Sequence, residues 1–130
     1  MGEKIGMIGL GKVGLELARQ MMADGHELFG YDIDPERMKM LADEGGTPVD
    51  SSKIVAENCD ITCSILLAPE HIEENTIGEN GIVQAGKKGL IHIEMSTMAP
   101  SFQVELAGKL AAHGIDMLDA PISGSHDKAA

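Results

Sequence analysis

Residues 4–14 read Lys4-Ile-Gly-Met-Ile-Gly9-Leu-Gly11-Lys-Val-Gly14, a short apolar run that leads into the spacing G-x-G-x-x-G. A stretch with helical periodicity follows, and then a strand-like stretch, Glu27-Leu-Phe-Gly-Tyr-Asp32, that ends in an acid. Strand, glycine turn, helix and acid-terminated second strand together predict a βαβ unit that binds a dinucleotide.

The three glycines of this spacing have separate mechanical roles. Gly9 lets the chain turn tightly out of the strand, Gly11 lets backbone approach a pyrophosphate, and Gly14 lets the helix pack closely. The helix that begins here offers unpaired N–H groups and the positive end of its dipole to phosphate. The intervening residues complete the predicted phosphate-binding turn: Leu10, Lys12 and Val13. The alternative is a glycine turn that binds no ligand.

Asp32 stands 18 residues after Gly14, at the end of the second predicted strand. A carboxylate there accepts hydrogen bonds from the adenosine ribose hydroxyls and repels a 2′-phosphate. The next residue is Ile33 rather than an arginine that could neutralise such a phosphate, so we predict NAD rather than NADP. The alternative role for Asp32 is to cap the following helix, although Asp34, directly before Pro35, is the better cap.

The rest of the chain alternates strand-like and helix-like segments. Three helix-like segments end at a glycine that precedes a strand: Gly25, Gly45 and Gly114. We predict strands near 4–8, 27–31, 47–49, 61–66, 90–93 and 115–118, helices near 11–24, 35–44, 52–58, 69–76 and 100–113, and a loop over 77–89. The fold class is α/β: a Rossmann-type doubly wound, mostly parallel sheet with helices on both faces, in three layers and with strand order 3-2-1-4-5-6.

Helical spacing also predicts which side chains face the sheet. For the first helix these are Gly14, Leu17, Ala18, Met21 and Met22, and for the last helix Val104, Ala107, Leu110 and Ala111. Ser51 or Ser52 is expected to cap the third helix, and 98–101 to begin the last one.

Composition excludes several classes of function. With 10 Lys and Arg against 21 Asp and Glu, the net charge is −11, which argues against nucleic acid and against anionic membranes as partners. Cys59 and Cys63 match neither C-x-x-C nor a secreted disulfide pattern, no apolar run is long enough to span a membrane, and no signal peptide is evident. The five histidines lack metal-ligand spacing. We therefore expect a cytoplasmic protein of one domain, residues 1–130, without a metal.

Three further segments follow predicted strands, where open α/β sheets bind ligands. Leu66, Leu67 and Ala68 are expected to form an apolar wall beside the cofactor. Ser96 and Thr97 could hydrogen-bond the nicotinamide ribose, or one of them could cap the helix near residue 100. Ser123, Gly124 and Ser125 could meet a substrate carboxylate, although from spacing alone a surface loop is the simpler interpretation.

The chain resembles the β-hydroxyacid dehydrogenase family over its whole length. The residues that carry the resemblance form five segments: Gly9–Gly14, Gly25-His26, Gly78–Gly81, Glu94–Pro100 and Gly114–Gly124. The resemblance implies hydride transfer between NAD and a short β-hydroxy acid, such as 3-hydroxyisobutyrate or tartronate semialdehyde/glycerate. It also implies that Thr97 contacts the cofactor and that Ser123, Gly124 and Ser125 grip the small-molecule substrate. Assembly into a homo-oligomer stays open.

Four departures from the family pattern stand out. Glu94 replaces the usual Asp, the usual M-L-P-x segment reads Ile65-Leu-Leu-Ala68, and Ser125 replaces a glycine. The family's catalytic lysine lies beyond this loop, on a helix that leads into an all-helical second domain, and Lys128 does not match it. We therefore expect the nucleotide-binding half of such an enzyme, with no catalytic residue of its own, that binds NAD weakly and turns over nothing alone. The alternative is a stand-alone NAD(H)-binding sensor or interaction module.

Overall fold

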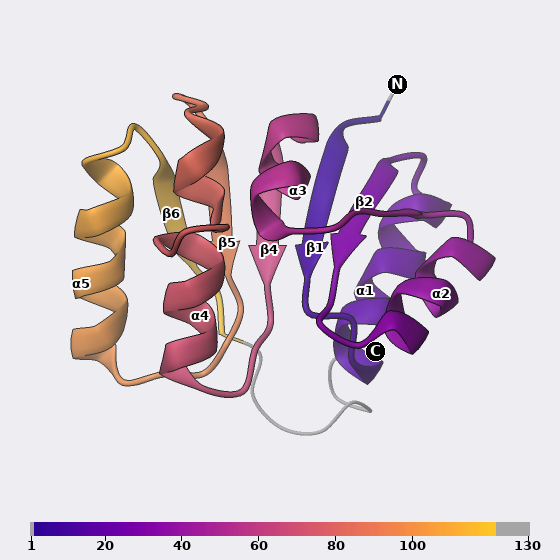
Figure 1. The fold of residues 1–130 in the computed structure, drawn as a ribbon, viewed down its shortest axis with the longest axis horizontal. Coiled ribbons are helices and arrows are strands. Elements are labelled where there is room, and N and C mark those ends of the chain that lie inside the picture. Colours follow the sequence, from indigo (N-terminus) through magenta and orange to yellow (C-terminus); the bar gives the residue numbers. More distant parts are fainter. Residues whose placement is uncertain (1, 122–130) are drawn as a thin grey trace.

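The computed structural model describes residues 2–121 and contains one parallel sheet of six strands in the order β3-β2-β1-β4-β5-β6 (Figure 1). The strands are β1 (Lys4–Ile8), β2 (Glu27–Tyr31), β3 (Thr47–Pro48), β4 (Ile61–Ser64), β5 (Ile91–Glu94) and β6 (Asp116–Asp119). The helices are α1 (Lys12–Ala23), α2 (Pro35–Asp43), α3 (Ser52–Asn58), α4 (Pro69–Thr76) and α5 (Pro100–Ala111), with a 3₁₀ helix, η1 (Ile82–Ala85). The predicted fold class and strand order are confirmed.

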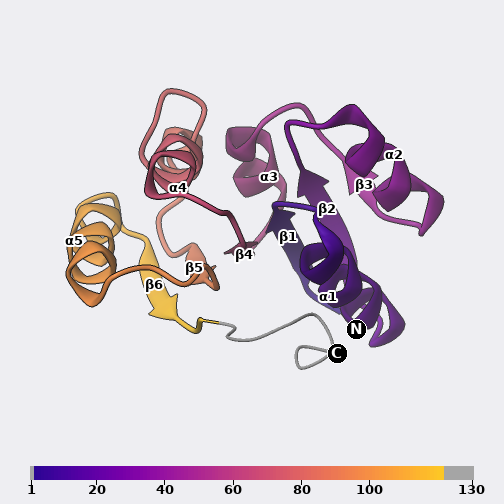
Figure 2. The same cartoon turned by 90° about the horizontal axis from the view of Figure 1, so that it is seen from below.

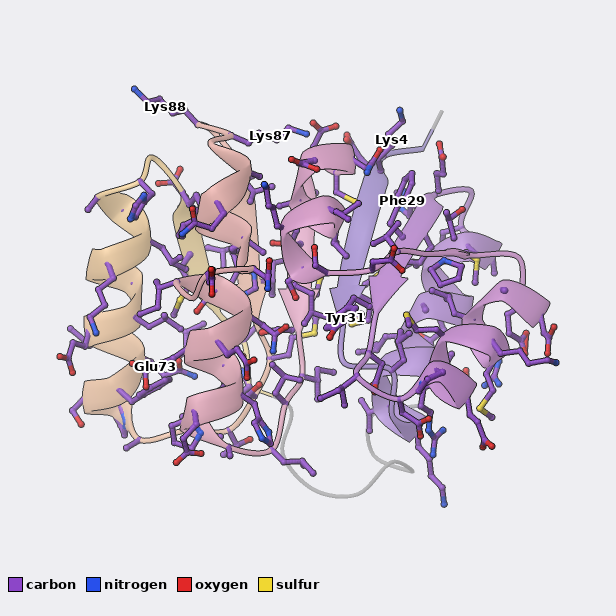
Figure 3. The ribbon with its side chains drawn as sticks, viewed as in Figure 1. Lys4, Phe29, Tyr31, Glu73, Lys87 and Lys88 are labelled. Atoms are coloured by element: carbon purple, nitrogen blue, oxygen red, sulfur yellow. The ribbon has the colours of Figure 1, made fainter. Side chains whose placement is uncertain are left out.

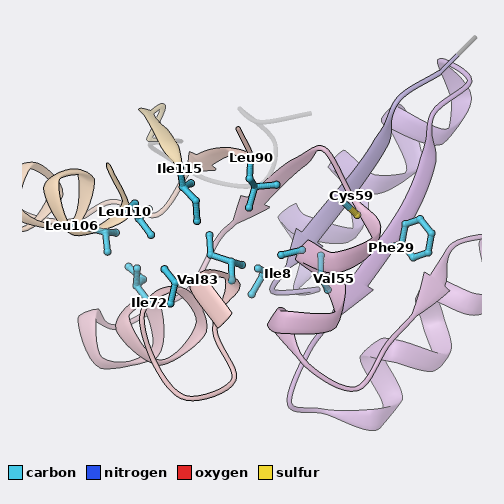
Figure 4. Packing of buried hydrophobic residues seen from close by; sticks show 12 residues of the cluster. Ile8, Phe29, Val55, Cys59, Ile72, Val83, Leu90, Leu106, Leu110 and Ile115 are labelled. Carbon is cyan, nitrogen blue, oxygen red and sulfur yellow. The ribbon is translucent and has the colours of Figure 1, made fainter. Parts of the chain in front are cut away.

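Helices cover both faces of the sheet, as Figure 2 shows in a view turned by 90°. Helices α1 and α2 pack on one face, against Met7 of β1 and Leu28 of β2. On the other face, α3, α4, α5 and η1 pack over a second cluster that includes Ile8 of β1, and Figure 4 shows this cluster from close by. Gly6 lets α3 approach β1, because a Cβ at residue 6 would overlap the Val55 side chain.

Local sequence signals account for most element boundaries. The Asp34 carboxylate accepts a hydrogen bond from the Glu36 amide at the start of α2, and the Ser51 hydroxyl accepts one from the Ile54 amide at the start of α3. Gly25, Gly45 and Gly114 all have positive φ just after a helix, as the glycines at the ends of the helix-like segments predicted. No helix among the described residues is long and apolar enough to cross a membrane.

The strand ends lie within one residue of the prediction except in the strand expected over 61–66, and the loop expected over 77–89 also differs. The expected strand 61–66 ends at Ser64, because the Leu66 amide donates to the Ser96 hydroxyl rather than to a neighbouring strand. The expected loop 77–89 contains η1, because Ile82 and Val83 are buried there and hold one helical turn.

The inward face of α5 was predicted correctly only in part. Leu110 is buried and Ala107 is half-buried, as expected, but Val104 is 74% exposed and Ala111 is also exposed. Gln103 and Leu106 face the interior in their place. The register of α5 depends on its contacts with β6 and α4 at the edge of the sheet, which apolar spacing does not reveal.

Within residues 2–121, the face that carries α1 and α2 is only partly covered over β4–β6. Ile91 is 36% exposed and Leu118 is 56% exposed, and Ile61 and Ile93 are half-buried. Parallel sheets in α/β proteins usually have both faces covered, so this half-face is an apolar surface suited to a further contact.

Candidate functional site

The glycine turn lies at the carboxyl edge of the sheet, between the end of β1 and the start of α1. Gly9 has a φ of +97°, and a Cβ there would overlap the Ile65 carbonyl oxygen. A Cβ at residue 14 would overlap the Gly9 carbonyl oxygen, so Gly14 lets α1 lie against the turn itself. These two glycines are required by the protein's own packing.

Gly11 is required by nothing inside the protein. A Cβ built there meets no heavy atom within 4 Å, and its φ of −69° suits any residue. Gly11 is also the N-cap of α1, where no side chain caps the helix and the first turn carries no acid. The first amides of a helix have no intrahelical acceptor, so an open surface above them fits an anionic group such as a pyrophosphate.

The Asp32 side chain connects the second strand to the glycine turn. Its Oδ2 accepts a hydrogen bond from the Leu10 amide at 2.7 Å, and its Oδ1 accepts one from the Asp34 amide at 2.9 Å. Asp34, not Asp32, caps α2. A carboxylate has about four acceptor positions, so Asp32 keeps acceptor capacity for ribose hydroxyls while it shapes the turn.

A groove on the β2 side of the turn, here called the β2-side groove, opens beside Asp32. It is lined by Ile8, Gly9, Tyr31, Asp32, Ile33, Leu66, His71, Glu74 and Asn75. Burial, and then the carboxylates of Glu74 and Asp32, raise the pKa of Tyr31, so its phenol stays a hydrogen-bond donor. Ile33 is 88% exposed. The mixture of apolar walls and polar tips fits a flat heteroaromatic ring.

The residues that α4 contributes to this groove were not predicted from the sequence. His71 and Asn75 lie one turn apart on α4, and the Asn75 side-chain amide donates to the His71 carbonyl at 2.8 Å. The Asn75 oxygen accepts from the Ser52 hydroxyl of α3 at 2.6 Å. No local pattern marks these residues, because only the folded sheet brings α4 to the end of β2.

A second groove, the β5-side groove, lies on the other side of the turn and shares Leu66 with the first. Its lining is Val13, Ile65, Leu66, Leu67, Met95, Ser96, Thr97 and Met98. Two of the three residues predicted to form an apolar wall, Leu66 and Leu67, line this groove, and Leu67 is 94% exposed. Ala68, half-buried, is the N-cap of α4. Thr97 is exposed within this groove.

Ser96 lines the β5-side groove but is almost fully buried. It is 2% exposed, and its hydroxyl accepts the Leu66 amide at 2.8 Å. Neither Ser96 nor Thr97 caps α5, because the N-cap is Ala99 and no side-chain hydrogen bond caps the helix. The hydroxyl of Ser96 joins the segments after β4 and β5.

Below Ser96 lies a fully buried polar network between β4 and β5. Glu94 accepts hydrogen bonds from the Ser64 hydroxyl, from His92 Nε2 at 3.0 Å and from the Ser96 amide at 3.2 Å. Burial opposes the charged form of Glu94 and by itself would raise its pKa. The hydrogen bond and charge of His92, together with the hydrogen bonds of Ser64 and Ser96, outweigh burial and lower the pKa of Glu94. Glu94 is therefore a buried carboxylate.

The two cysteines take no part in the site. Both are free and fully buried, and burial raises the pKa of each thiol to about 12. Cys63 is the small buried hydrophobe that its apolar context predicted.

Figure 3 shows Lys4, Lys87 and Lys88 at the other end of the sheet, away from the glycine turn. These three lysines are therefore too far from the glycine turn to contact an anion bound there.

The predicted substrate loop, Ser123, Gly124 and Ser125, lies outside the described residues. The structure therefore brings together one continuous set of predicted residues, from Asp32 past the glycine turn and Leu66 to Thr97.

Residues 4–130 match the family model described as the NAD binding domain of 6-phosphogluconate dehydrogenase. L-threonate dehydrogenase of Cupriavidus necator is 34% identical over 130 residues, all of this chain and 44% of that protein. The chain is an NAD-binding domain of the β-hydroxyacid dehydrogenase family. Human mitochondrial 3-hydroxyisobutyrate dehydrogenase is 37% identical over 120 residues, 92% of this domain and 36% of that protein.

A solved structure agrees with this assignment. The NAD-binding domain superposes on 3-hydroxyisobutyrate dehydrogenase of Salmonella typhimurium with a TM-score of 0.88 and 27% identity, over 97% of this chain and 44% of that one. The domain thus spans less than half the length of these relatives. The relatives favour the nucleotide-binding part of an oxidoreductase over a stand-alone sensor.

Proposed function

We propose that this NAD-binding domain serves an oxidoreductase that transfers hydride between NAD and a short-chain β-hydroxy acid. The pyrophosphate would lie on the first turn of α1, over Gly11, Lys12 and Val13. The observation that carries the proposal is the open space at Gly11 above an uncapped helix N-terminus. The cofactor supplies the redox chemistry, and the protein supplies binding and orientation.

The two grooves suggest how the rest of the cofactor would lie. Asp32 would accept the adenosine ribose hydroxyls, with Ile33 beside them and the adenine in the β2-side groove. The nicotinamide half would follow the β5-side groove past Leu66, Leu67 and Ala68 to Thr97. Because Asp32 is a carboxylate without a basic neighbour at residue 33, NAD is preferred to NADP.

Relatives named for 3-hydroxyisobutyrate and L-threonate support a small hydroxy acid as the substrate. We propose that Ser123, Gly124 and Ser125 bind it. The catalytic lysine would come from a second, helical domain. Either that domain or a second copy of the chain in a homo-oligomer could pack on the apolar half-face over β4–β6. The free cysteines and the negative charge support a cytoplasmic location.

The test of cofactor binding is Gly11→Ala, measured by calorimetry with NADH. The added Cβ meets no protein atom, so the fold should keep its thermal midpoint, while the methyl occupies the space that the pyrophosphate needs. We expect NADH affinity to fall by at least about tenfold, the equivalent of about 1.4 kcal/mol.

Gly108→Ala is the matched control. Gly108 is exposed in α5, and a Cβ there also meets nothing within 4 Å. This variant should bind NADH like the unmodified chain. Unchanged NADH affinity in Gly11→Ala, or no NADH binding by the unmodified chain, would overturn the proposed function.

A further inference from the structure

Ser96 is held by all three of its polar groups. Its amide donates to Glu94 Oε2 at 3.2 Å, its hydroxyl accepts from the Leu66 amide at 2.8 Å, and its carbonyl accepts from Gln103 Nε2 at 3.2 Å. These contacts come from β5, from the segment after β4 and from α5. Ser96 is therefore a junction of three elements rather than a surface residue.

Glu94 is the anchor of this junction. Its carboxylate is 0% exposed and receives donors from both strands: Ser64 of β4, and His92 and the Ser96 amide on the β5 side. His92 is held in turn by the Thr62 hydroxyl at 2.8 Å. A buried carboxylate needs several donors to remain charged, so the network fixes the positions of its donors.

The junction lies directly behind the β5-side groove. Leu66, whose amide it holds, lines both grooves, and Thr97, the residue after Ser96, is exposed in the β5-side groove. We propose that Glu94 and Ser96 are positioning residues that fix Leu66 and Thr97 and so shape the nicotinamide end of the cofactor site. The inference rests on the proposed function and deepens it, because it assigns this end of the site to a buried network.

ADP separates this role from general loss of stability. It carries the adenosine and the pyrophosphate but lacks the nicotinamide ribose and ring, the half of NADH that is proposed to lie in the β5-side groove. In Ser96→Ala, the Leu66 amide loses its acceptor while the volume of the side chain barely changes. We expect NADH to bind about 5- to 10-fold more weakly, as for one lost hydrogen bond, and ADP to bind within about twofold of its affinity for the unmodified chain.

Two further variants complete the test. Thr76→Val is the control, because it also removes one buried hydroxyl, whose hydrogen bond to the Ile72 carbonyl lies within α4. It should leave both affinities unchanged. Glu94→Gln keeps the side-chain volume but has one acceptor oxygen instead of two, so it should weaken NADH selectively, as Ser96→Ala does. The fluorescence of bound NADH reports the nicotinamide environment directly and should change in both network variants.

The outcomes distinguish this inference from the proposed function. If Ser96→Ala and Glu94→Gln weaken the binding of NADH and of ADP equally, or weaken neither, the positioning role is refuted although the chain binds the cofactor. If the unmodified chain binds neither ligand, the proposed function itself fails.

Discussion

Asp32 offers the sharpest test of cofactor choice, through the substitution Asp32→Asn. Each oxygen of the Asp32 carboxylate accepts one backbone hydrogen bond: Oδ2 from the Leu10 amide at 2.7 Å and Oδ1 from the Asp34 amide at 2.9 Å. Asparagine has one acceptor oxygen, so one of these amides loses its partner. Such a loss costs about 1–2 kcal/mol, which for a chain of this size lowers the thermal midpoint by roughly 3–8 °C.

Asp32→Asn should change the affinities for NADH and for NADPH differently, because only NADPH carries a 2′-phosphate. A carboxylate about 4 Å from a 2′-phosphate is repelled by about 1 kcal/mol per charge pair in water and by about 4 kcal/mol near a protein surface. Asp32 is half-buried, so its repulsion lies between these limits. Removing the charge should therefore improve NADPH relative to NADH by at least about fivefold.

Fluorescence titration of the unmodified chain and of Asp32→Asn with NADH and NADPH measures this ratio. The control is Asp34→Asn, which removes a carboxylate two residues away but keeps a side chain that caps α2 equally well. Its ratio should stay close to that of the unmodified chain. Equal affinity of the unmodified chain for both cofactors, or an unchanged ratio in Asp32→Asn, would refute the role assigned to Asp32.

Three further predictions concern stability and reactivity. The pKa of Glu94 in the folded chain lies below its ordinary value of 4.5, so its ionised form stabilises the fold above pH 4.5. This contribution disappears as the pH falls through the folded pKa. Acid titration followed by circular dichroism should therefore show a shallower loss of stability below about pH 4.5 in Glu94→Gln than in the unmodified chain. Gly9→Ala should destabilise the chain by more than about 1 kcal/mol in urea, since residue 9 has a φ of +97° and its Cβ would overlap the Ile65 carbonyl; an unchanged midpoint would show that the turn can rearrange. The thiols of Cys59 and Cys63, with pKa values raised to about 12 by burial, should react with a thiol reagent only after denaturation, and rapid labelling of the native chain at pH 8 would contradict their burial.

The sequence alone determined the features that depend on local spacing. The G-x-G-x-x-G turn, the caps at Asp34 and Ser51 and the glycines after the helices follow from backbone geometry within a few residues. Alternating strands and helices, joined by right-handed crossovers, then restrict the sheet to few topologies. The predicted strand order was correct for this reason.

The tertiary structure decided what depends on contacts between distant segments. The sequence offered Ser96 as a cofactor contact or as a helix cap. In the structure it caps no helix, and its hydroxyl accepts a hydrogen bond from the amide of Leu66, 30 residues earlier in the chain. Val104 lies outward because the packing of α5 at the sheet edge sets its register, and the need for glycine at residue 6 arises only when Val55 of α3 packs against it. Such pairings join residues whose separation along the chain carries no periodic signal, so only the assembled sheet reveals them.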